Sequence, residues 1–220
     1  MSPSRHRLCV CLLASGLVAV AAMVAVAAVA APKPAATPKP PPPAAAAAAQ
    51  NPGDLDEVLA LLATHKHGHA EFIEQKFLAA LNRPIESSGE LRFDAPDHLE
   101  QRTLKPRAET LILDSGTLTV DRGRTHRVMD MHAFPQIEPL VESIRATLAG
   151  DRAALEHLFR IEFSGSLPRW TLTLVPLESK VKQLVAQVKI DGVREQLIKV
   201  EIRQTDGDRS LMTLRPAAAP

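Results

Sequence analysis

Apolar residues recur at helical spacing twice in the region that follows residue 53. Asp54 is a candidate N-cap for the first helix, with Glu57 three residues later. The apolar stripe of this helix consists of Leu55, Val58, Leu59 and Leu62. The second stripe consists of Ile137, Leu140, Val141, Ile144 and Leu148. The spacing therefore predicts helices over 54–65 and 137–150, and Asp151 is a candidate cap for a short helix over 151–159.

Apolar and polar residues alternate through most of the remaining sequence, which is typical of strands with one solvent-exposed face. Asp114-Ser115-Gly116 separates two apolar runs and predicts a hairpin. Asp191-Gly192 and Asp206-Gly207-Asp208 are predicted to be turns between later strands. The predicted strands cover 90–94, 99–104, both sides of the Asp114 turn, 125–133, 160–165, 169–177, 185–192, 194–204 and 209–215.

This order of helix, strands, helices and strands predicts an α+β domain with a long antiparallel meander. Each strand keeps one apolar face, so the helices at 54–65 and 137–150 are expected to cover that side of the sheet. The covered space is either a core filled by side chains or a cavity for acyl chains. The pattern leaves both possibilities open.

The stretch 70–81, AEFIEQKFLAAL, has two interpretations. By propensity it is a helix, because Ala, Leu, Glu, Gln and Lys dominate it. By alternation it is a strand, with Phe72 on one face and Ile73 and Phe77 on the other. A helix would extend a small helical unit, whereas a strand would begin the large sheet.

The first thirty residues predict an export signal. Arg5 and Arg7 precede an apolar run over 8–29, and Ala28-Val29-Ala30 fits a peptidase site. The run is long enough to span a bilayer, so an uncleaved inner-membrane anchor is the alternative. Residues 31–53 are rich in Pro and Ala and predict an extended linker, which leaves 54–220 as one domain in the periplasm.

Composition excludes several classes of function. Both cysteines, Cys9 and Cys11, lie in the predicted signal, so its removal would leave no disulfide or thiol chemistry. The chain has 26 Lys and Arg against 25 Asp and Glu, and this balance provides no basic field for nucleic acid. Aromatic residues make up only 3% of the chain, so the interior is expected to be aliphatic.

His65, His67 and His69 alternate along a short segment and could bind zinc or copper. The alternative is a solvated loop, because Gly68 interrupts the segment and no further ligand completes a spacing motif. Elsewhere the sequence has no nucleophile elbow, phosphate-binding glycine loop or redox motif. Neither an enzyme nor a cofactor is expected.

The order of short motifs from residue 70 onward resembles the LolA-like family, the periplasmic carriers of outer-membrane lipoproteins. The matching positions are Ala70, Phe72, Glu74, Ser87, Gly89, Leu91, Pro96, Pro106, Glu109, Asp114 and Gly116. The resemblance implies an unclosed antiparallel β-barrel with amphipathic helices as a lid over an apolar cavity. It also implies that 70–81 is the first strand.

The sequence departs from the well-studied carriers at two places. Ala95 stands before Pro96, where those carriers have an arginine that latches the lid. The chain also stops soon after the last predicted strand, without their C-terminal extension. With these departures, the sequence resembles a divergent LolA-related branch of the family. They leave the nature of the cargo open.

The resemblance implies a monomeric periplasmic carrier that holds the acyl chains of a lipoprotein or another lipid for transfer toward the outer membrane. An inner-membrane exporter would be the donor, and an outer-membrane protein the acceptor. The alternative is a non-enzymatic structural or interaction domain with a filled core. The candidate lipid-binding residues are Leu59, Leu62, Phe72, Leu91, Phe93, Leu99, Ile112, Leu118, Met129, Met131, Leu140 and Ile144.

Overall fold

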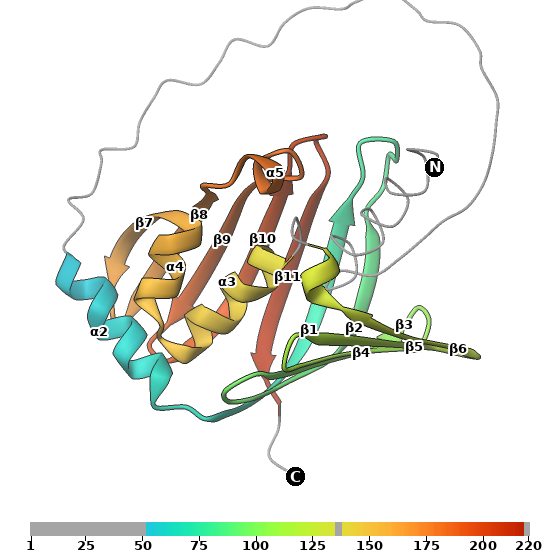
Figure 1. The fold of residues 1–220 in the computed structure, drawn as a ribbon, viewed down its shortest axis with the longest axis horizontal. Helices are drawn as coiled ribbons and strands as arrows, with labels where there is room; N and C mark the ends of the chain where they lie inside the picture. The colour runs from blue at the N-terminus through green and yellow to red at the C-terminus, as the bar shows by residue number, and fades with distance from the viewer. Residues whose placement is uncertain (1–51, 135–137, 218–220) are drawn as a thin grey trace, which may run out of the picture.

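A single antiparallel sheet of eleven strands forms the body of the molecule (Figure 1). The structure, a computed structural model, describes residues 52–134 and 138–217, so the predicted signal, most of the linker and Ile137 lie outside the described residues. The strands of the first half are β1 (His67–Phe77), β2 (Ile85–Asp94), β3 (His98–Lys105), β4 (Glu109–Asp114), β5 (Thr117–Arg122) and β6 (Thr125–Asp130). Those of the second half are β7 (Phe159–Ser166), β8 (Arg169–Pro176), β9 (Val185–Val193), β10 (Gln196–Gln204) and β11 (Arg209–Pro216).

The first and last strands meet in the middle of the sheet. The spatial order is β6-β5-β4-β3-β2-β1-β11-β10-β9-β8-β7, and every neighbouring pair is antiparallel. Phe72 of β1 is in register with Gly89 of β2 on one side and with Leu214 of β11 on the other. The sheet does not close, because β6 and β7 are both edges. The predicted open antiparallel half-barrel is confirmed.

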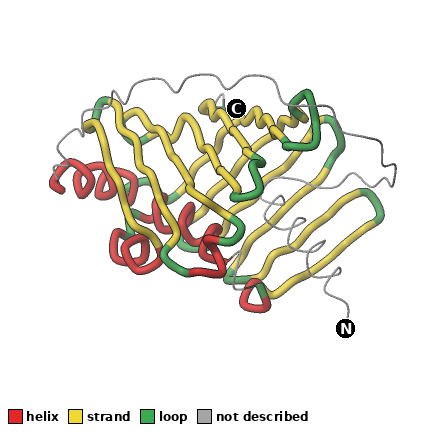
Figure 2. The backbone as a smooth tube through the Cα atoms, turned by 90° about the horizontal axis from the view of Figure 1, so that it is seen from above, coloured by secondary structure: helices red, strands yellow, loops and turns green. Residues whose placement is uncertain are grey.

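The helices lie on one side of this curved sheet (Figure 2). They are α2 (Pro52–Ala63), α3 (Glu138–Ala149), α4 (Arg152–Leu158) and the short α5 (Ser179–Lys182). The predicted helices at 54–65, 137–150 and 151–159 correspond to α2, α3 and α4, with ends shifted by one or two residues. Asp151 caps α4 as predicted, because its carboxylate accepts a hydrogen bond of 3.0 Å from the Ala154 amide. None of the helices in residues 52–134 and 138–217 is long and apolar enough to cross a membrane.

The stretch with two interpretations is a strand over most of its length. β1 runs from His67 to Phe77 and is paired on both sides, which satisfies its backbone groups against its helical propensity. Phe72 points to the helix side and is 1% exposed, whereas Ile73 on the other face is 42% exposed. The strand begins at His67, so the alternative of a loop through His67 and His69 is wrong.

Two other sequence predictions are corrected. The predicted strand over 125–133 ends at Asp130, and Met131–Ala133 form a 3-10 turn, η1, since the Asp130 carboxylate accepts from the His132 amide. Asp191-Gly192 is not a turn but part of β9; the chain reverses at Arg194 and Glu195, where Arg194 has φ of 53°. Gly192 is needed inside the strand because an added Cβ would lie 2.1 Å from the Trp170 ring.

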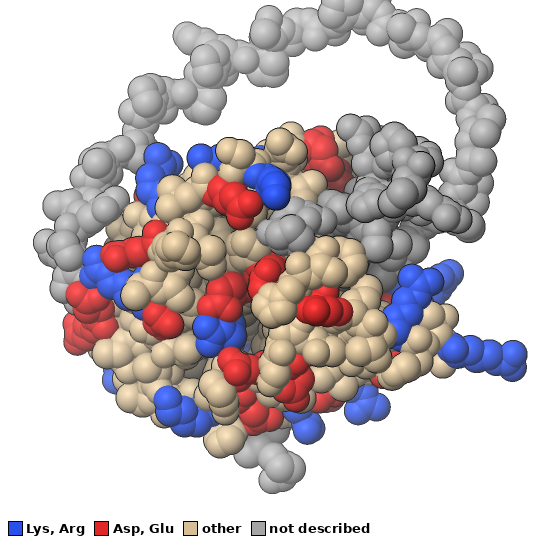
Figure 3. All heavy atoms as spheres, viewed as in Figure 1, with Lys and Arg blue, Asp and Glu red and all other residues tan. Residues whose placement is uncertain are grey.

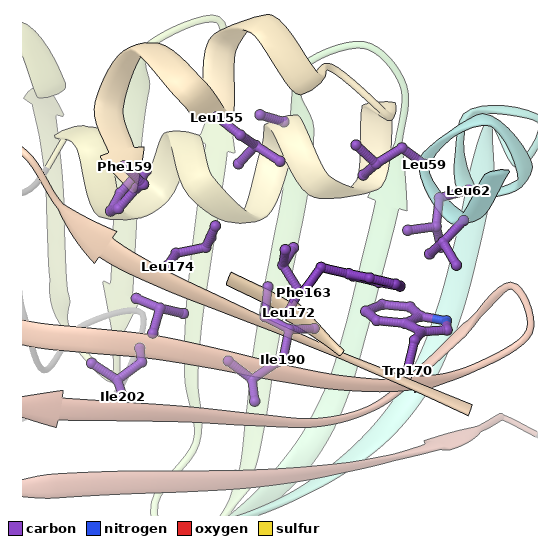
Figure 4. Packing of buried hydrophobic residues seen from close by; sticks show 14 of the residues in the cluster. Leu59, Leu62, Leu155, Phe159, Phe163, Trp170, Leu172, Leu174, Ile190 and Ile202 are labelled. Atoms are coloured by element: carbon purple, nitrogen blue, oxygen red, sulfur yellow. The ribbon is translucent and has the colours of Figure 1, made fainter. Parts of the chain in front are cut away.

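Two apolar clusters lie on the helix side of the sheet. The large cluster joins the β7–β11 half to α2 and α4, and includes Trp170, Phe163, Leu172, Leu59 and Leu155 (Figure 4). The small cluster lies on β4 and β5 and consists of Leu111, Leu113, Leu118, Met131 and Val141. Helix α3 contributes Leu140 to the large cluster and Val141 to the small one, so it spans both.

Charged side chains are mixed over the face that carries the helices (Figure 3). Basic groups project at the β5–β6 end of the sheet. Arg124 and Arg127 lie in this hairpin and are exposed, which disfavours pairing of the β6 edge with another sheet.

Candidate functional site

A cavity of about 310 Å³ lies between the sheet and α3. Its wall on the sheet comes from β1, β2, β3, β10 and β11, and its helical wall from α2 and α3. The strands contribute apolar side chains that include Leu91, Phe93, Leu99, Val200, Ile202, Met212 and Leu214. The helices contribute Leu62, Ile144 and Leu148. The lining is therefore mainly aliphatic.

The exposed lining residues gather at one end of the cavity, which we call the mouth. They are His65, His67, Gly68, His69, Arg92, Gln196 and Pro216. His67 Nδ1 lies 2.6 Å from Asp94 Oδ1, and His69 Nε2 lies 3.6 Å from Glu90 Oε2. Each imidazole thus has its own acidic neighbour, and no group of three or more His, Cys, Asp or Glu in the described ranges is arranged to hold a metal ion.

The opposite end of the cavity reaches a buried polar group. Ser210 lines the cavity, and the Ser210 hydroxyl donates to Glu74 Oε1 at 2.6 Å. Ser87 donates to Glu74 Oε2 at 3.1 Å. Burial raises the pKa of the Glu74 carboxyl, although the nearby Lys76 ammonium and the two hydroxyls favour its ionised form. Ser210 therefore presents an oxygen acceptor to the cavity, since its proton is directed at Glu74.

Lys76 lies beside this group on β1, in register with Ser210. Burial lowers the pKa of its ammonium to about 8, although the carboxylates of Glu74 and Glu109 favour the charged form. Glu109 is itself buried and forms a close ion pair with Arg122. Beyond the inner end of the apolar cavity, the helix side of the sheet thus carries charged groups from β1, β4 and β5.

The structure separates the predicted lipid-binding residues into three groups. Leu62, Leu91, Phe93, Leu99 and Ile144 line the cavity together. Leu59, Phe72 and Leu140 belong to the large cluster, and Leu118, Met131 and Met129 belong to or pack against the small one.

Ile112 lies on the opposite face of β4 from the buried Leu111 and Leu113, so we withdraw it as a cavity residue. It is in register with Glu100 and Thr119, and these positions lie on the face away from the helices.

The sequence prediction missed the contribution of the last strands. Ser210, Met212 and Leu214 alternate along β11 and line the cavity, as do Val200 and Ile202 of β10. Their period of two was visible in the sequence. The pattern could not show that β11 pairs with β1, which places Met212 beside Glu74 and Leu214 beside Phe72.

The fold and cavity define an open half-barrel protein with a helical lid. Within this class, the chain belongs to the family described as outer membrane lipoprotein carrier protein LolA-like, which residues 45–220 match. No curated protein sequence matches the chain.

Several solved structures are similar in fold. A LolA superfamily protein from Nitrosomonas europaea is 8% identical, with a TM-score of 0.40 over 77% of this chain and 94% of that chain. The lipoprotein LppX from Mycobacterium tuberculosis is 11% identical, with a TM-score of 0.42 over 78% of this chain and 100% of that chain. MucB from Pseudomonas aeruginosa, in complex with MucA, is 14% identical with a TM-score of 0.43; the match covers 76% of this chain and 58% of that chain.

Proposed function

We propose that the protein is a periplasmic carrier that holds the acyl chains of a lipoprotein, or of another lipid, during transfer toward the outer membrane. Membership of the LolA-like carrier family supports this role. The observation that carries the proposal is the apolar cavity of about 310 Å³ between the sheet and α3. Its volume lies in the range typical of small-molecule sites.

The cavity suits a hydrocarbon chain energetically. Transfer of one methylene group from water to an apolar site is worth about 0.8 kcal/mol, so about ten of them contribute roughly 8 kcal/mol. The strand ends at the mouth are exposed, so a polar head group there can remain in water. An amphiphile would therefore enter with its chain inside and its head at the mouth.

The carrier role implies partners at both membranes. We propose an inner-membrane exporter as donor, an outer-membrane acceptor, and a monomeric carrier that residues 1–30 direct to the periplasm, with the binding of cargo as its only activity. Both partners must reach the mouth, because the exposed lining residues lie at that end.

The direct test is to purify the protein from the periplasm without detergent and to record its native mass. We expect additional mass that solvent extraction identifies as lipid. A mass equal to that of the polypeptide, together with no uptake of a fluorescent fatty acid, would contradict the proposal. That result would favour the alternative, an interaction domain on the same fold.

A matched pair of variants on β11 tests whether the cavity is the binding site. Leu214 is half-buried and lines the cavity, so Leu214→Trp should fill it and reduce fatty-acid binding at least ten-fold. Thr213, the preceding residue, is exposed on the opposite face, and Thr213→Trp is the control. Equal loss of binding in both variants, or in neither, would place the ligand elsewhere.

A further inference from the structure

Gln101 is an unpaired polar side chain in the wall of the apolar cavity. It lies on β3, is 2% exposed and lines the cavity. Both Nε2 and Oε1 of its amide are buried and have no hydrogen-bond partner in residues 52–134 and 138–217. Glu109 is the other residue there with buried side-chain oxygens lacking a hydrogen bond, but it has an ion pair with Arg122.

The residues around Gln101 explain why its amide is unpaired. Its register partners are Leu91 on β2 and Leu111 on β4, and both are apolar. A buried amide without a partner destabilises the folded protein, whereas an apolar side chain of the same size would not. An unpaired amide at a cavity wall is therefore available to form hydrogen bonds with a ligand.

The position of Gln101 along the cavity indicates which part of a ligand it meets. Arg92 at the mouth is in register with Glu100, and Gln101 is one residue further in, roughly 3 Å at the rise of a strand. The apolar lining continues past this point to Met212 and Ile202. A head group at the mouth and a chain at the inner end would place the linkage between them beside Gln101.

The chemistry of an amide limits what can pair with it. The side-chain amide of Gln101 offers N–H donors and a carbonyl acceptor, so a complete partner must both accept and donate. An ester accepts a hydrogen bond but donates none, and it would leave Oε1 of Gln101 unpaired. The N–H and C=O of a trans amide point to opposite sides, so such a linkage donates to Oε1 of Gln101 through its N–H, while Nε2 of Gln101 donates to an oxygen of the head group.

Resting on the proposed function as a lipid carrier, we propose that Gln101 selects cargo whose acyl chain is attached through an amide. The chain occupies the aliphatic part of the cavity, and the amide N–H of the ligand donates to Oε1 of Gln101. Gln101 acts as a specificity residue within the cavity, distinct from the apolar residues that provide affinity for any chain.

The test compares two ligands that differ at one atom. N-palmitoylglycine and O-palmitoylglycolate have the same chain and the same carboxylate, and differ in N–H against O at the linkage. Competition with a fluorescent fatty acid on the full exported protein gives the two Kd values. We expect the amide to bind about five- to ten-fold tighter than the ester, the effect of one lost hydrogen bond to a buried group.

Two variants assign the preference to Gln101. Gln101→Met keeps the length of the side chain and removes its polar atoms, so the two ligands should bind within about two-fold of each other. Its Tm without ligand should be equal to or above that of the wild type, because an unpaired amide has been removed. Gln187 lies on the half-exposed outer side of β9, and Gln187→Met should keep the preference.

The outcomes distinguish this proposal from the proposed function. Equal binding of the two ligands by the wild type, or a preference that persists in Gln101→Met, would overturn the role of Gln101 and leave lipid binding intact. A large fall in Tm for the ligand-free Gln101→Met variant would show that the amide has a structural partner, and would also overturn it. If neither ligand binds, the carrier function itself fails.

Discussion

The guanidinium of Arg145 on α3 lies 3.4 Å from the carboxylate of Asp97 in the β2–β3 turn. Arg145 also donates to Glu142 within its own helix. This contact connects the helix that spans both apolar clusters to the strand end at the mouth of the cavity. Asp97 lies two residues from Ala95, one of the positions at which the sequence departs from the carriers it resembles.

Removing this contact should accelerate release of the ligand. Asp97 is partly exposed, so the ion pair is worth at most about 1 kcal/mol, and Asp97→Ala should leave the Tm nearly unchanged. Loss of about 1 kcal/mol of stabilisation would raise the dissociation rate of a fluorescent fatty acid by up to about five-fold. Stopped-flow displacement measures this rate. Glu156→Ala removes a partner of Arg152 away from the mouth and is the control; an equal acceleration there would contradict a specific role for Asp97.

Leu140 and Ile144 lie one turn apart on α3 but should respond differently to truncation. Leu140 is 3% exposed in the large cluster, so Leu140→Ala should lower the free energy of unfolding by about 2–5 kcal/mol. Ile144 lines the cavity, and Ile144→Ala should weaken fatty-acid binding several-fold with a loss of stability below about 1.5 kcal/mol. Urea unfolding and ligand titration of both variants provide the measurements. Similar profiles would mean that α3 has no distinct cavity side.

Gly192→Ala should disturb the packing of Trp170. The added Cβ would lie 2.1 Å from the indole ring, so the strand or the ring must move, at a loss of at least about 1–3 kcal/mol. Trp170 is the only tryptophan, and its fluorescence should therefore report both the altered packing and the earlier unfolding in urea. Gly68→Ala is the control, because its nearest neighbour, Phe93 Cβ, is 3.8 Å away. Wild-type stability of Gly192→Ala would contradict the close approach.

Lys76 should make stability rise with pH. Its pKa is about 8 in the folded protein and 10.5 in the unfolded chain, so between these values the unfolded state binds more protons. The free energy of unfolding should increase across this window by up to ~3 kcal/mol. Urea unfolding of the wild type and of Lys76→Met should be measured at pH 8 and above. The free energy of unfolding of the wild type should increase relative to that of the variant as pH rises.

The control for Lys76 is the same substitution at Lys180, which is exposed on α5. The free energy of unfolding of Lys180→Met should differ from that of the wild type by an amount that stays constant across the same pH window. A constant difference between the wild type and Lys76→Met across the window would mean that Lys76 stays charged when buried.

The sequence pattern predicted most helices and strands, but not which face of every strand points to the helices. Helices α2, α3 and α4 follow from apolar stripes and from caps such as Asp151, which act locally. The buried face of β4 could not be predicted from the sequence, because Leu111, Ile112 and Leu113 are all apolar and show no alternation. Register with β3 and β5 decides that Leu111 and Leu113 point to the helices.

The cavity was harder to predict than the fold. Leu91 and Leu99, two of the predicted lipid-binding residues, line the cavity, but the pairing of β1 with β11 brings another wall from the far end of the sequence. Gln101 is a polar residue within the predicted strand over 99–104, and no motif distinguishes it. Gly192 was predicted to lie in a turn, but it lies in β9, where its lack of a side chain leaves room for the ring of Trp170.

The pairing of Phe72 with Leu214 has a kinetic consequence. These residues are separated by 142 positions, so β1 has neighbours on both sides only after the last strand has been made. Contacts between such distant segments form slowly, because a long loop must close before any pairing energy is gained. A chain emerging from the ribosome therefore stays without its complete sheet until synthesis is nearly finished.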